Sequence, residues 1–235
     1  MKLLASAPTG FDFYFSERVD GDARDAPRLR AALSLARKSD VLVPMLRLSQ
    51  VHSREIITVK ESPMGAAPIG DFVNIGQGDA IVSSTPGVAA AVLVADCVPI
   101  GIYDRALDLV AVVHAGWRGV GARIVTNAVA TMRELGAQDL TAFLGPHARS
   151  CCYEFSPNDI EELSISVGCN LAARTRSGQA SLDLERAIAF QLERLGIALD
   201  RPGAECTICG PGYFSYRGGD LKERGALVVL PPTLS

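Results

Sequence analysis

The sequence lacks several features that mark common classes of protein. The chain of 235 residues has a net charge of −3, which excludes the basic field that a general nucleic-acid binder needs. It has no apolar run of the roughly 18 to 20 residues that span a membrane, and its first residues lack a signal-peptide pattern. We therefore expect a cytoplasmic protein that binds neither nucleic acid nor membrane.

Histidine is scarce, with three in the chain, whereas cysteine occurs six times. In a cytoplasmic protein of this size we expect reduced thiols or metal ligands rather than disulfides. Cys206 and Cys209 have the CxxC spacing of half a structural zinc site, and the only other clustered cysteines are Cys151 and Cys152. Because no second CxxC is present, this spacing alone is weak support for a metal or redox role.

The pattern of apolar residues predicts an α+β protein with one domain over residues 1–235. A helix is expected to begin after Ser156, whose hydroxyl can cap it and which precedes a proline. Further helices are expected at 26–38, 120–135 and 182–195. Strands are expected at 41–47, 50–59, 79–83, 90–103, 108–116, 140–144, 206–209 and 226–230, with a loop over 60–78.

The expected strands 90–103 and 108–116 bring Cys97 opposite His114 if residues 104–107 form a four-residue hairpin loop. Directly opposed residues share a face of the sheet, with Cβ atoms roughly 4.5–5.5 Å apart. A metal ion with a thiolate at about 2.3 Å and an imidazole at about 2.0 Å can bridge that gap. A register slip of one residue would place the two side chains on opposite faces.

Other residues near this pair offer further chemistry. The glycine-rich turn 116–121 lies where a strand ends and a helix begins, a place that permits close backbone approach or binds an anion. Arg118 and Arg217 could bind phosphate or carboxylate through the guanidinium fork. Asp79 and Asp96 are the nearest carboxylates. Either could move a proton, but Asp79 could simply end a strand and Asp96 could be a buried hydrogen-bonding group.

These motifs together resemble the YfiH-like family, also called the laccase-domain or polyphenol oxidase-like family and peptidoglycan editing factor. The matching segments are Gln50–His52, Ala95–Pro99, His114–Gly119, Leu144–Pro146, Tyr153–Glu154, Cys206–Thr207 and Phe214–Arg217. The resemblance implies a mixed sheet sandwich of the kind shared with cytotoxic necrotizing factor. It also implies a zinc ion bound by His52, Cys97 and His114.

The resemblance further implies a purine nucleoside enzyme that uses a nucleoside and phosphate as small-molecule partners. The implied reactions are phosphorolysis of adenosine, inosine, guanosine or methylthioadenosine, and deamination of adenosine. In this hypothesis Cys97, His114 and Arg217 are catalytic, with zinc activating water for attack on C6 and Arg217 orienting phosphate against C1′. Copper is the less favoured metal, because three histidines cannot supply both a blue-copper site and a trinuclear cluster.

Two other hypotheses stay open. Cys97 and His114 could be the nucleophile and base of a thiol hydrolase or amidase that edits peptidoglycan precursors. The chain could also be a binding protein that keeps the scaffold without catalysis. The sequence departs from the family pattern in the loosely matching segment 13–21 with Arg18, at Ser53, at His147 and near Arg224, so it assigns no role to these residues.

Overall fold

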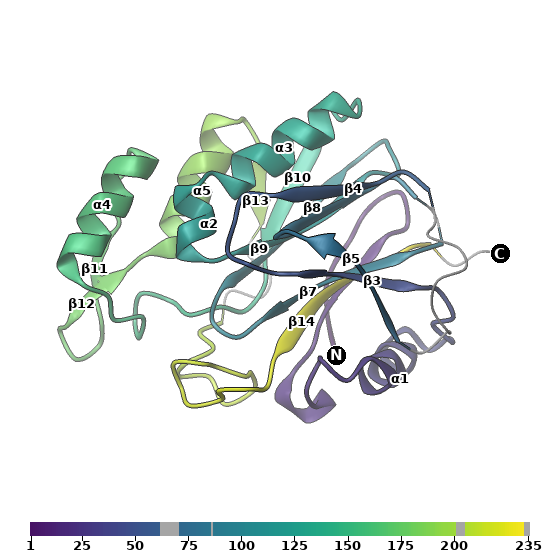
Figure 1. Cartoon of the computed structure of the whole chain (residues 1–235), viewed down its shortest axis with the longest axis horizontal. Helices are drawn as coiled ribbons and strands as arrows, with labels where there is room; N and C mark the ends of the chain where they lie inside the picture. Colours follow the sequence, from purple (N-terminus) through teal and green to yellow (C-terminus); the bar gives the residue numbers. More distant parts are fainter. Residues whose placement is uncertain (62–70, 86, 201–204, 233–235) are drawn as a thin grey trace.

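The computed structural model describes residues 1–61, 71–85, 87–200 and 205–232. Two six-stranded mixed sheets form its centre (Figure 1). The first sheet has the order β1 (Lys2–Ser6), β2 (Asp12–Phe15), β14 (Gly225–Leu230), β7 (Ala89–Val94), β3 (Met45–Ser49) and β5 (Phe72–Gln77). The second has the order β13 (Ala198–Asp200), β10 (Leu140–Leu144), β8 (Val98–Asp104), β9 (Val110–Ala115), β6 (Ala80–Ser83) and β4 (Ile56–Val59).

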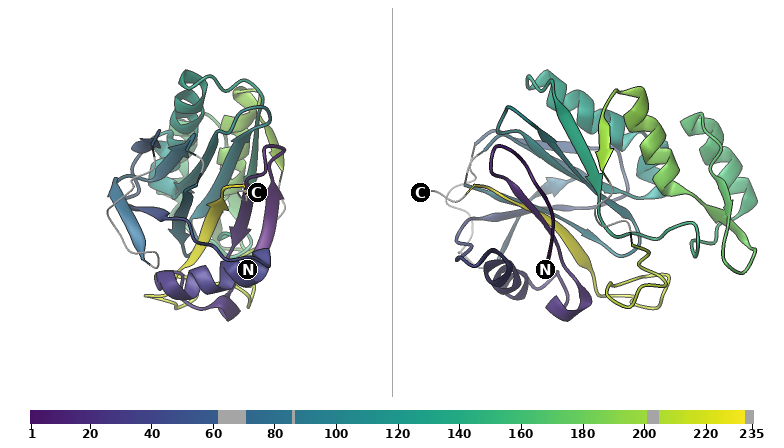
Figure 2. Two further views of the ribbon diagram at one scale, coloured as in Figure 1. Left: turned by 90° about the vertical axis from the view of Figure 1, so that its right-hand side faces the viewer. Right: turned by 180° about the vertical axis from the view of Figure 1, so that it is seen from behind.

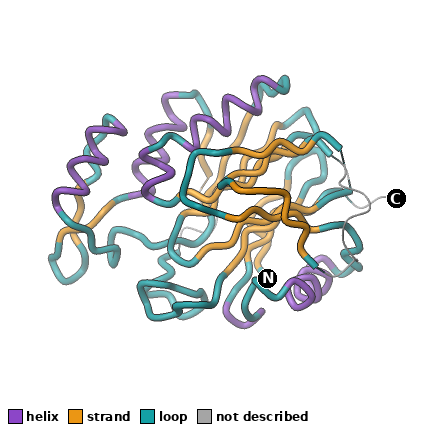
Figure 3. Tube along the Cα trace, viewed as in Figure 1, coloured by secondary structure: helices purple, strands orange, loops and turns teal. Residues whose placement is uncertain are grey.

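Helices lie outside the two sheets, as the side and rear views in Figure 2 and the colouring of Figure 3 show. The helices are α1 (Ala26–Arg37), α2 (Trp117–Gly121), α3 (Ile124–Glu134), α4 (Pro157–Val167) and α5 (Leu184–Arg194). Apolar residues of α1 pack on the outer face of the first sheet, and those of α2, α3 and α5 on the outer face of the second. A small hairpin, β11 (Ala172–Arg174) and β12 (Ala180–Leu182), packs beside α4. In the described ranges no helix combines the length and apolarity that a membrane crossing requires.

The predicted α+β class and the mixed sheet sandwich are therefore confirmed. The predicted helix after Ser156 is also correct, because α4 begins at Pro157 and the Ser156 hydroxyl accepts a hydrogen bond from the Asp159 N–H at 3.2 Å. The helix predicted at 26–38 corresponds to α1, whose N-terminal cap is the side chain of Asp25.

Alternation along the strands separates the core between the sheets from the cores under the helices. In β9, Val110 and Val112 belong to the cluster between the sheets, whereas Ala111 and Val113 pack toward α2, α3 and α5. His114 continues the series of Val110 and Val112. Because side chains alternate along a strand, His114 points to the space between the sheets, where β9 ends.

The single strand predicted at 90–103 is wrong, because the chain forms β7 in the first sheet and β8 in the second. It crosses between the sheets at residues 95–97, where Asp96 has a φ of 89°. Both strands are buried on both faces, so their sequences form one continuous apolar run without alternating polar residues. Nothing in that run shows where the first strand ends and the second begins. Asp96 is the one charged residue that interrupts the apolar run before the end of β8.

Other predicted elements are wrong wholly or in part, among them the strand predicted at 41–47, which begins only at Met45 as β3. The helix 120–135 is two helices, because Arg123 has a φ of 69° and ends the hydrogen-bonded series between them. Residues 206–209 form a turn and not a strand. The strand 50–59 begins only at β4, because a turn at His52, with a φ of 60°, precedes it. The predicted loop 60–78 contains β5, and its residues 62–70 lie outside the described residues.

Candidate metal centre and substrate cleft

The hairpin of β8 and β9 has a different register from the predicted one. Pro99, not Cys97, lies opposite His114. The loop is longer than four residues because Tyr103 pairs with Val110, and the Asp104 carboxylate accepts hydrogen bonds from N–H groups inside this wider loop. The register differs by two residues, which is one full side-chain period. The predicted direct pairing is therefore wrong, but Cys97 and His114 still share a face.

His52, Cys97 and His114 converge where the chain crosses between the sheets, and we call them the His–Cys cluster. One ligand atom from each lies within 4.8 Å of the others. Cys97 Sγ is 3.7 Å from His52 Nε2, and the two imidazole rings have centroids 4.8 Å apart at 76°. His114 is buried, whereas His52 is exposed. Two imidazoles and a thiol in this arrangement could hold one metal ion and leave a coordination position open to solvent.

Asp79, the residue before β6, holds both histidines in place. His114 Nδ1 donates a hydrogen bond to Asp79 Oδ1 at 2.8 Å, so His114 Nε2 is the ring nitrogen that faces Cys97 and could bind a metal ion with it. The same carboxylate accepts hydrogen bonds from the N–H of His52 at 3.0 Å and of Ser53 at 2.6 Å. Although burial opposes it, hydrogen bonding to His114 and Ser53 holds the pKa of Asp79 well below its usual range. We therefore interpret Asp79 as a charged acceptor that positions the cluster.

The glycine-rich turn after β9 permits the close approach of the His52 turn. A Cβ atom at Gly116 would lie 2.7 Å from His52 Cδ2 and 3.1 Å from Cys97 Sγ. A Cβ atom at Gly119 would lie 3.0 Å from the Ser53 carbonyl oxygen. Any larger residue at Gly116 would push the side chains of the cluster apart. Close approach is therefore the role that the geometry gives to these glycines.

Asp96 is a buried hydrogen-bonding group, which is one of the two roles considered from the sequence. Its carboxylate accepts hydrogen bonds from Thr207 Oγ1 at 2.6 Å, Ser215 Oγ at 2.7 Å and the Arg217 N–H at 2.7 Å. These bonds tie the crossing segment beside Cys97 to the loop that carries Arg217. Asp96 thereby positions the wall of the site.

Charge–charge interactions favour the thiolate form of Cys97. Burial raises the pKa of Cys97, but His114 and His52 outweigh it and lower the pKa to about 6. Burial lowers the pKa of His114, but Cys97 and Asp79 raise it to about 9. A thiolate is the form of cysteine that binds metal ions and also the form that attacks carbonyl carbons. The electrostatics of this pair therefore suit both the metal-site and the thiol-nucleophile hypotheses.

A cleft of about 540 Å³ opens at the His–Cys cluster, a size within the usual range for small-molecule sites. Its lining includes five arginines: Arg24, Arg47, Arg118, Arg217 and Arg224. Asp96 is the only acidic residue among the described residues of the lining, and its carboxylate is already hydrogen-bonded. The cleft therefore attracts anions.

Arg217 and Arg118 are held at the wall of this cleft by flat side chains. The guanidinium of Arg217 donates to the Glu154 carbonyl oxygen at 2.8 Å and lies 4.8 Å from the centre of the Tyr153 ring. That of Arg118 lies 4.4 Å from the centre of the Trp117 ring. The sequence pointed to both of these arginines but not to Arg24 or Arg47. The signal for Arg47 was a charged residue inside an apolar strand, MLRLS.

Two residues that differ from the family pattern lie away from the cluster. Arg18 donates two hydrogen bonds to Asp220, at 2.6 and 3.0 Å, and thereby supports the loop before β14. His147 is fully buried and its Nδ1 donates to the Gly145 carbonyl oxygen at 2.8 Å. Because His147 lies elsewhere, only two of the three histidines belong to the His–Cys cluster. This donor set fits one metal ion, whereas a trinuclear copper centre needs many more histidines.

A family model described as multi-copper polyphenol oxidoreductase laccase matches residues 16–230. The chain belongs to this family. The resemblance to the laccase-domain, YfiH-like family is thereby confirmed. The copper in the family's description is a statement about the family, since the His–Cys cluster has too few histidines for a trinuclear copper centre.

Individual relatives and solved structures agree with this family. A purine nucleoside phosphorylase of Clostridium acetobutylicum is 33% identical over 156 residues, which are 64% of this chain and 65% of that protein, just under two thirds of its length. A purine nucleoside phosphorylase of Mycobacterium bovis is 32% identical over 230 residues, 95% of this chain and 86% of that protein. The crystal structure of YfiH from Bacillus licheniformis superimposes with a TM-score of 0.77 at 21% identity, covering 94% of this chain and 92% of that one. This last likeness shows the shared fold.

Proposed function

We propose that this protein is a zinc-dependent purine nucleoside phosphorylase whose metal ligands are His52, Cys97 and His114. The observation that carries the proposal is the meeting, in one cleft, of three nitrogen and sulfur donors with the guanidinium groups of Arg118 and Arg217. Relatives named purine nucleoside phosphorylase over most of this chain support the choice of a purine nucleoside and phosphate as substrates.

Zinc is the metal that this donor set favours. Zinc binds imidazole and thiolate ligands tetrahedrally, and a catalytic zinc ion has three protein ligands and one open position. When bound, the ion would act as a Lewis acid toward an oxygen atom of a substrate in the cleft. Asp79 would keep His114 Nε2 directed at the ion, since it holds the opposite ring nitrogen.

The arginines would bind and orient the phosphate. In phosphorolysis a phosphate oxygen forms a bond to C1′ of the ribose while the bond from C1′ to N9 breaks, and the purine leaves with that electron pair and takes up a proton. Positive charge develops on the ribose before the phosphate oxygen bonds, so phosphate held beside C1′ stabilises the transition state. Arg217 is suited to hold it, because Glu154, Tyr153 and Asp96 fix its position.

The first test is whether the protein releases hypoxanthine from inosine only when phosphate is present. The variant Arg217→Gln removes a charged donor, and a hydrogen bond to a charged group is worth about 1.5–3 kcal/mol, so we expect the KM for phosphate to rise roughly tenfold or more. The KM for inosine should change little. Steady-state kinetics with each substrate varied in turn measures both values.

Arg105→Gln is the matched control. Arg105 is an exposed arginine that pairs with Asp139 at 3.7 Å and is absent from the cleft lining. It should leave both KM values unchanged. Absence of phosphate-dependent hypoxanthine release would contradict the proposal. Deamination of adenosine stays a prediction, and ammonia release without added phosphate would measure it.

The alternative of a thiol hydrolase is favoured by one observation. Cys97, His114 and Asp79 lie in the order nucleophile, base and orienting carboxylate, as in a cysteine–histidine–aspartate triad. A zinc-bound thiolate is not free to attack a carbonyl carbon. If metal-free protein were isolated and Cys97 reacted quickly with iodoacetamide, the thiol hydrolase would be the better hypothesis.

A further inference from the structure

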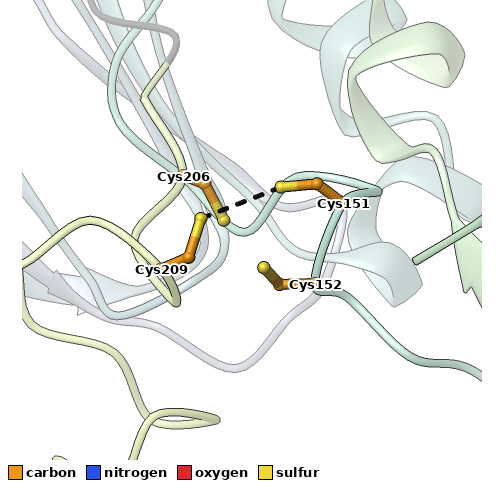
Figure 4. A group of neighbouring side chains, drawn as sticks. All are labelled: Cys151, Cys152, Cys206 and Cys209. Atoms are coloured by element: carbon orange, nitrogen blue, oxygen red, sulfur yellow. Dashed lines mark hydrogen bonds between the residues drawn. The ribbon is translucent and has the colours of Figure 1, made fainter. Parts of the chain in front are cut away.

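Four cysteines that the proposed reaction does not use lie together in space. Cys151 and Cys152 follow β10, and Cys206 and Cys209 lie in the loop that follows β13. Their four sulfur atoms lie within 4.8 Å of one another, and Sγ of Cys151 is 4.0 Å from Sγ of Cys209 (Figure 4). We call these residues the four-cysteine cluster. The sequence contains both halves of the cluster, but the spacing of a single CxxC gave only weak support for a metal site.

The separations suit a single metal ion better than disulfides. Zinc binds a thiolate sulfur at about 2.3 Å, which places the four sulfurs of a tetrahedral site roughly 3.8 Å from one another. The sulfurs of a disulfide are about 2.05 Å apart. All four cysteines are free thiols. The sulfur separations therefore come close to those of a tetrahedral thiolate site.

Two tight turns aim the sulfurs at one point. In the first, the N–H groups of Cys152 and Tyr153 both donate to the Arg149 carbonyl oxygen, at 3.0 and 2.9 Å. In the second, the Gly210 N–H donates to the Cys206 carbonyl oxygen at 2.8 Å. A Cβ atom at Gly210 would lie 2.6 Å from that oxygen, so the turn that follows the CxxC spacing needs a glycine.

The backbone joins the two turns and stabilises negative charge on sulfur. The His147 N–H donates to the Glu205 carbonyl oxygen at 3.1 Å, and the Thr207 N–H donates to the His147 carbonyl oxygen at 3.0 Å. Backbone N–H groups of Arg149, Cys209 and Ile208 are hydrogen-bonded to the Cys206 sulfur. Amide donors around a sulfur stabilise the thiolate that a metal ion requires.

We propose that the four-cysteine cluster is a second metal site, a structural zinc site with four thiolate ligands. With four protein donors it has no open position for a substrate. Its zinc ion would clamp the segment that holds Tyr153 and Glu154 to the loop that holds Arg217. The site would thus fix the wall of the cleft without taking part in the reaction.

The proposal is tested by the zinc content of untagged protein and of single variants. We expect about two zinc ions per chain in the wild type and about one in Cys209→Ser, because Cys209 is one of four ligands of a closed site. Cys209 is the exposed member of the cluster, so its replacement disturbs the fold least. Cys169→Ser is the matched control, since Cys169 belongs to neither cluster, and it should keep the wild-type content.

Equal zinc content in the wild type and Cys209→Ser would overturn the proposal. So would mass spectrometry that finds Cys151 or Cys152 bonded to Cys206 or Cys209 in protein purified without reductant. Iron in place of zinc at this cluster would overturn the assignment to zinc.

A second measurement does not require a variant of the four-cysteine cluster to fold. Cobalt loaded into Cys97→Ala would occupy the four-cysteine cluster alone, and its thiolate-to-cobalt charge-transfer absorption reports how many thiolates bind the ion. We expect the intensity of four thiolates. Absorption that reports fewer than four, or none, would contradict the proposal. Because this variant lacks the His–Cys cluster, the result is independent of whether the protein is a phosphorylase.

Discussion

The two clusters that contain cysteine differ in the kind and number of their donors and in what they face. The His–Cys cluster has two imidazoles and one thiol and faces a cleft lined by five arginines. The four-cysteine cluster has four thiols, and none of them belongs to that lining. Three donors leave a position for a substrate, whereas four close the coordination shell. In the two proposals above, the number of donors is what separates the reactive site from the structural one.

The clusters also differ in what supports their ligands. The His–Cys cluster depends on a buried carboxylate, Asp79, which accepts hydrogen bonds from one histidine ring and from the turn that carries the other. The four-cysteine cluster depends on backbone amides of its own two turns. A substitution can remove a side-chain hydrogen bond but not the backbone amides of a turn. The hydrogen bonds that position the His–Cys cluster can therefore be tested by substitution at Asp79.

Removal of a ligand from the His–Cys cluster should have the largest effect on activity. In Cys97→Ala we expect phosphorolysis to fall at least about 10³-fold, because a Lewis acid contributes several kcal/mol and each 1.36 kcal/mol is tenfold in rate. The variant kcat/KM for inosine, measured with the zinc content, tests this. Cys169→Ala should keep wild-type kcat/KM. Activity of Cys97→Ala within tenfold of the wild type would show that the His–Cys cluster is not the reactive one.

Replacement of Asp79, the carboxylate that positions the His–Cys cluster, should have a smaller effect, measured as the affinity for zinc. Asp79→Asn keeps the size of the side chain but turns an amide NH₂ toward the N–H groups of Ser53 or the ring N–H of His114. Partners of this kind change metal affinity or activity by about 10- to 100-fold. Competition with a chromophoric chelator measures the affinity for zinc. The four-cysteine cluster should keep its affinity in the same titration, and a parallel loss from both clusters would indicate general unfolding instead.

The pair Cys97 and His114 could be predicted from the sequence through an assumed hairpin, whereas His52 and the crossing between the sheets could not. Cys97 and His114 were correctly placed on one face although the register was wrong by two residues, because the side-chain period is two. His52 rested on the family resemblance, since it lies in a turn with a left-handed backbone and not in a strand. The crossing between the sheets at Asp96 could not be predicted, because the strands before and after it are buried on both faces.

The four-cysteine cluster could not be predicted for a different reason. Its two halves belong to turns far apart in the sequence, and hydrogen bonds between residues 147 and 205–207 bring them together. Neither turn has a periodic pattern, and the spacing of one CxxC does not say which other cysteines are near. The sequence therefore contained the ligands but not their proximity.

Asp104 is a second buried carboxylate, but it stabilises a loop of the fold and contacts no proposed metal ligand. Its replacement should therefore have the smallest effect on the proposed metal sites. Its oxygens accept hydrogen bonds from the N–H groups of Ala106, Leu107, Gln138 and Asp139, at 2.8 to 3.1 Å. Asp104→Asn should lower the free energy of unfolding at neutral pH by about 1–3 kcal/mol, because a buried donor loses its acceptor. Zinc content should not change, in contrast to Asp79→Asn.

The pH dependence of this loss gives the test its sign. Burial raises the pKa of Asp104, but the N–H groups of Ala106, Gln138, Leu107 and Asp139 outweigh it and lower the pKa. A lowered pKa in the folded state means that the charged carboxylate adds stability above its unfolded pKa of about 3.9, and that this stability is lost as the pH falls through the folded pKa. Urea unfolding at neutral pH and below about pH 4 should therefore show the gap between wild type and Asp104→Asn shrinking in acid. If the difference in the free energy of unfolding between wild type and Asp104→Asn stayed constant with pH, the negative charge of Asp104 would not contribute to stability. The comparison with the charged carboxylate of Asp79 would then fail.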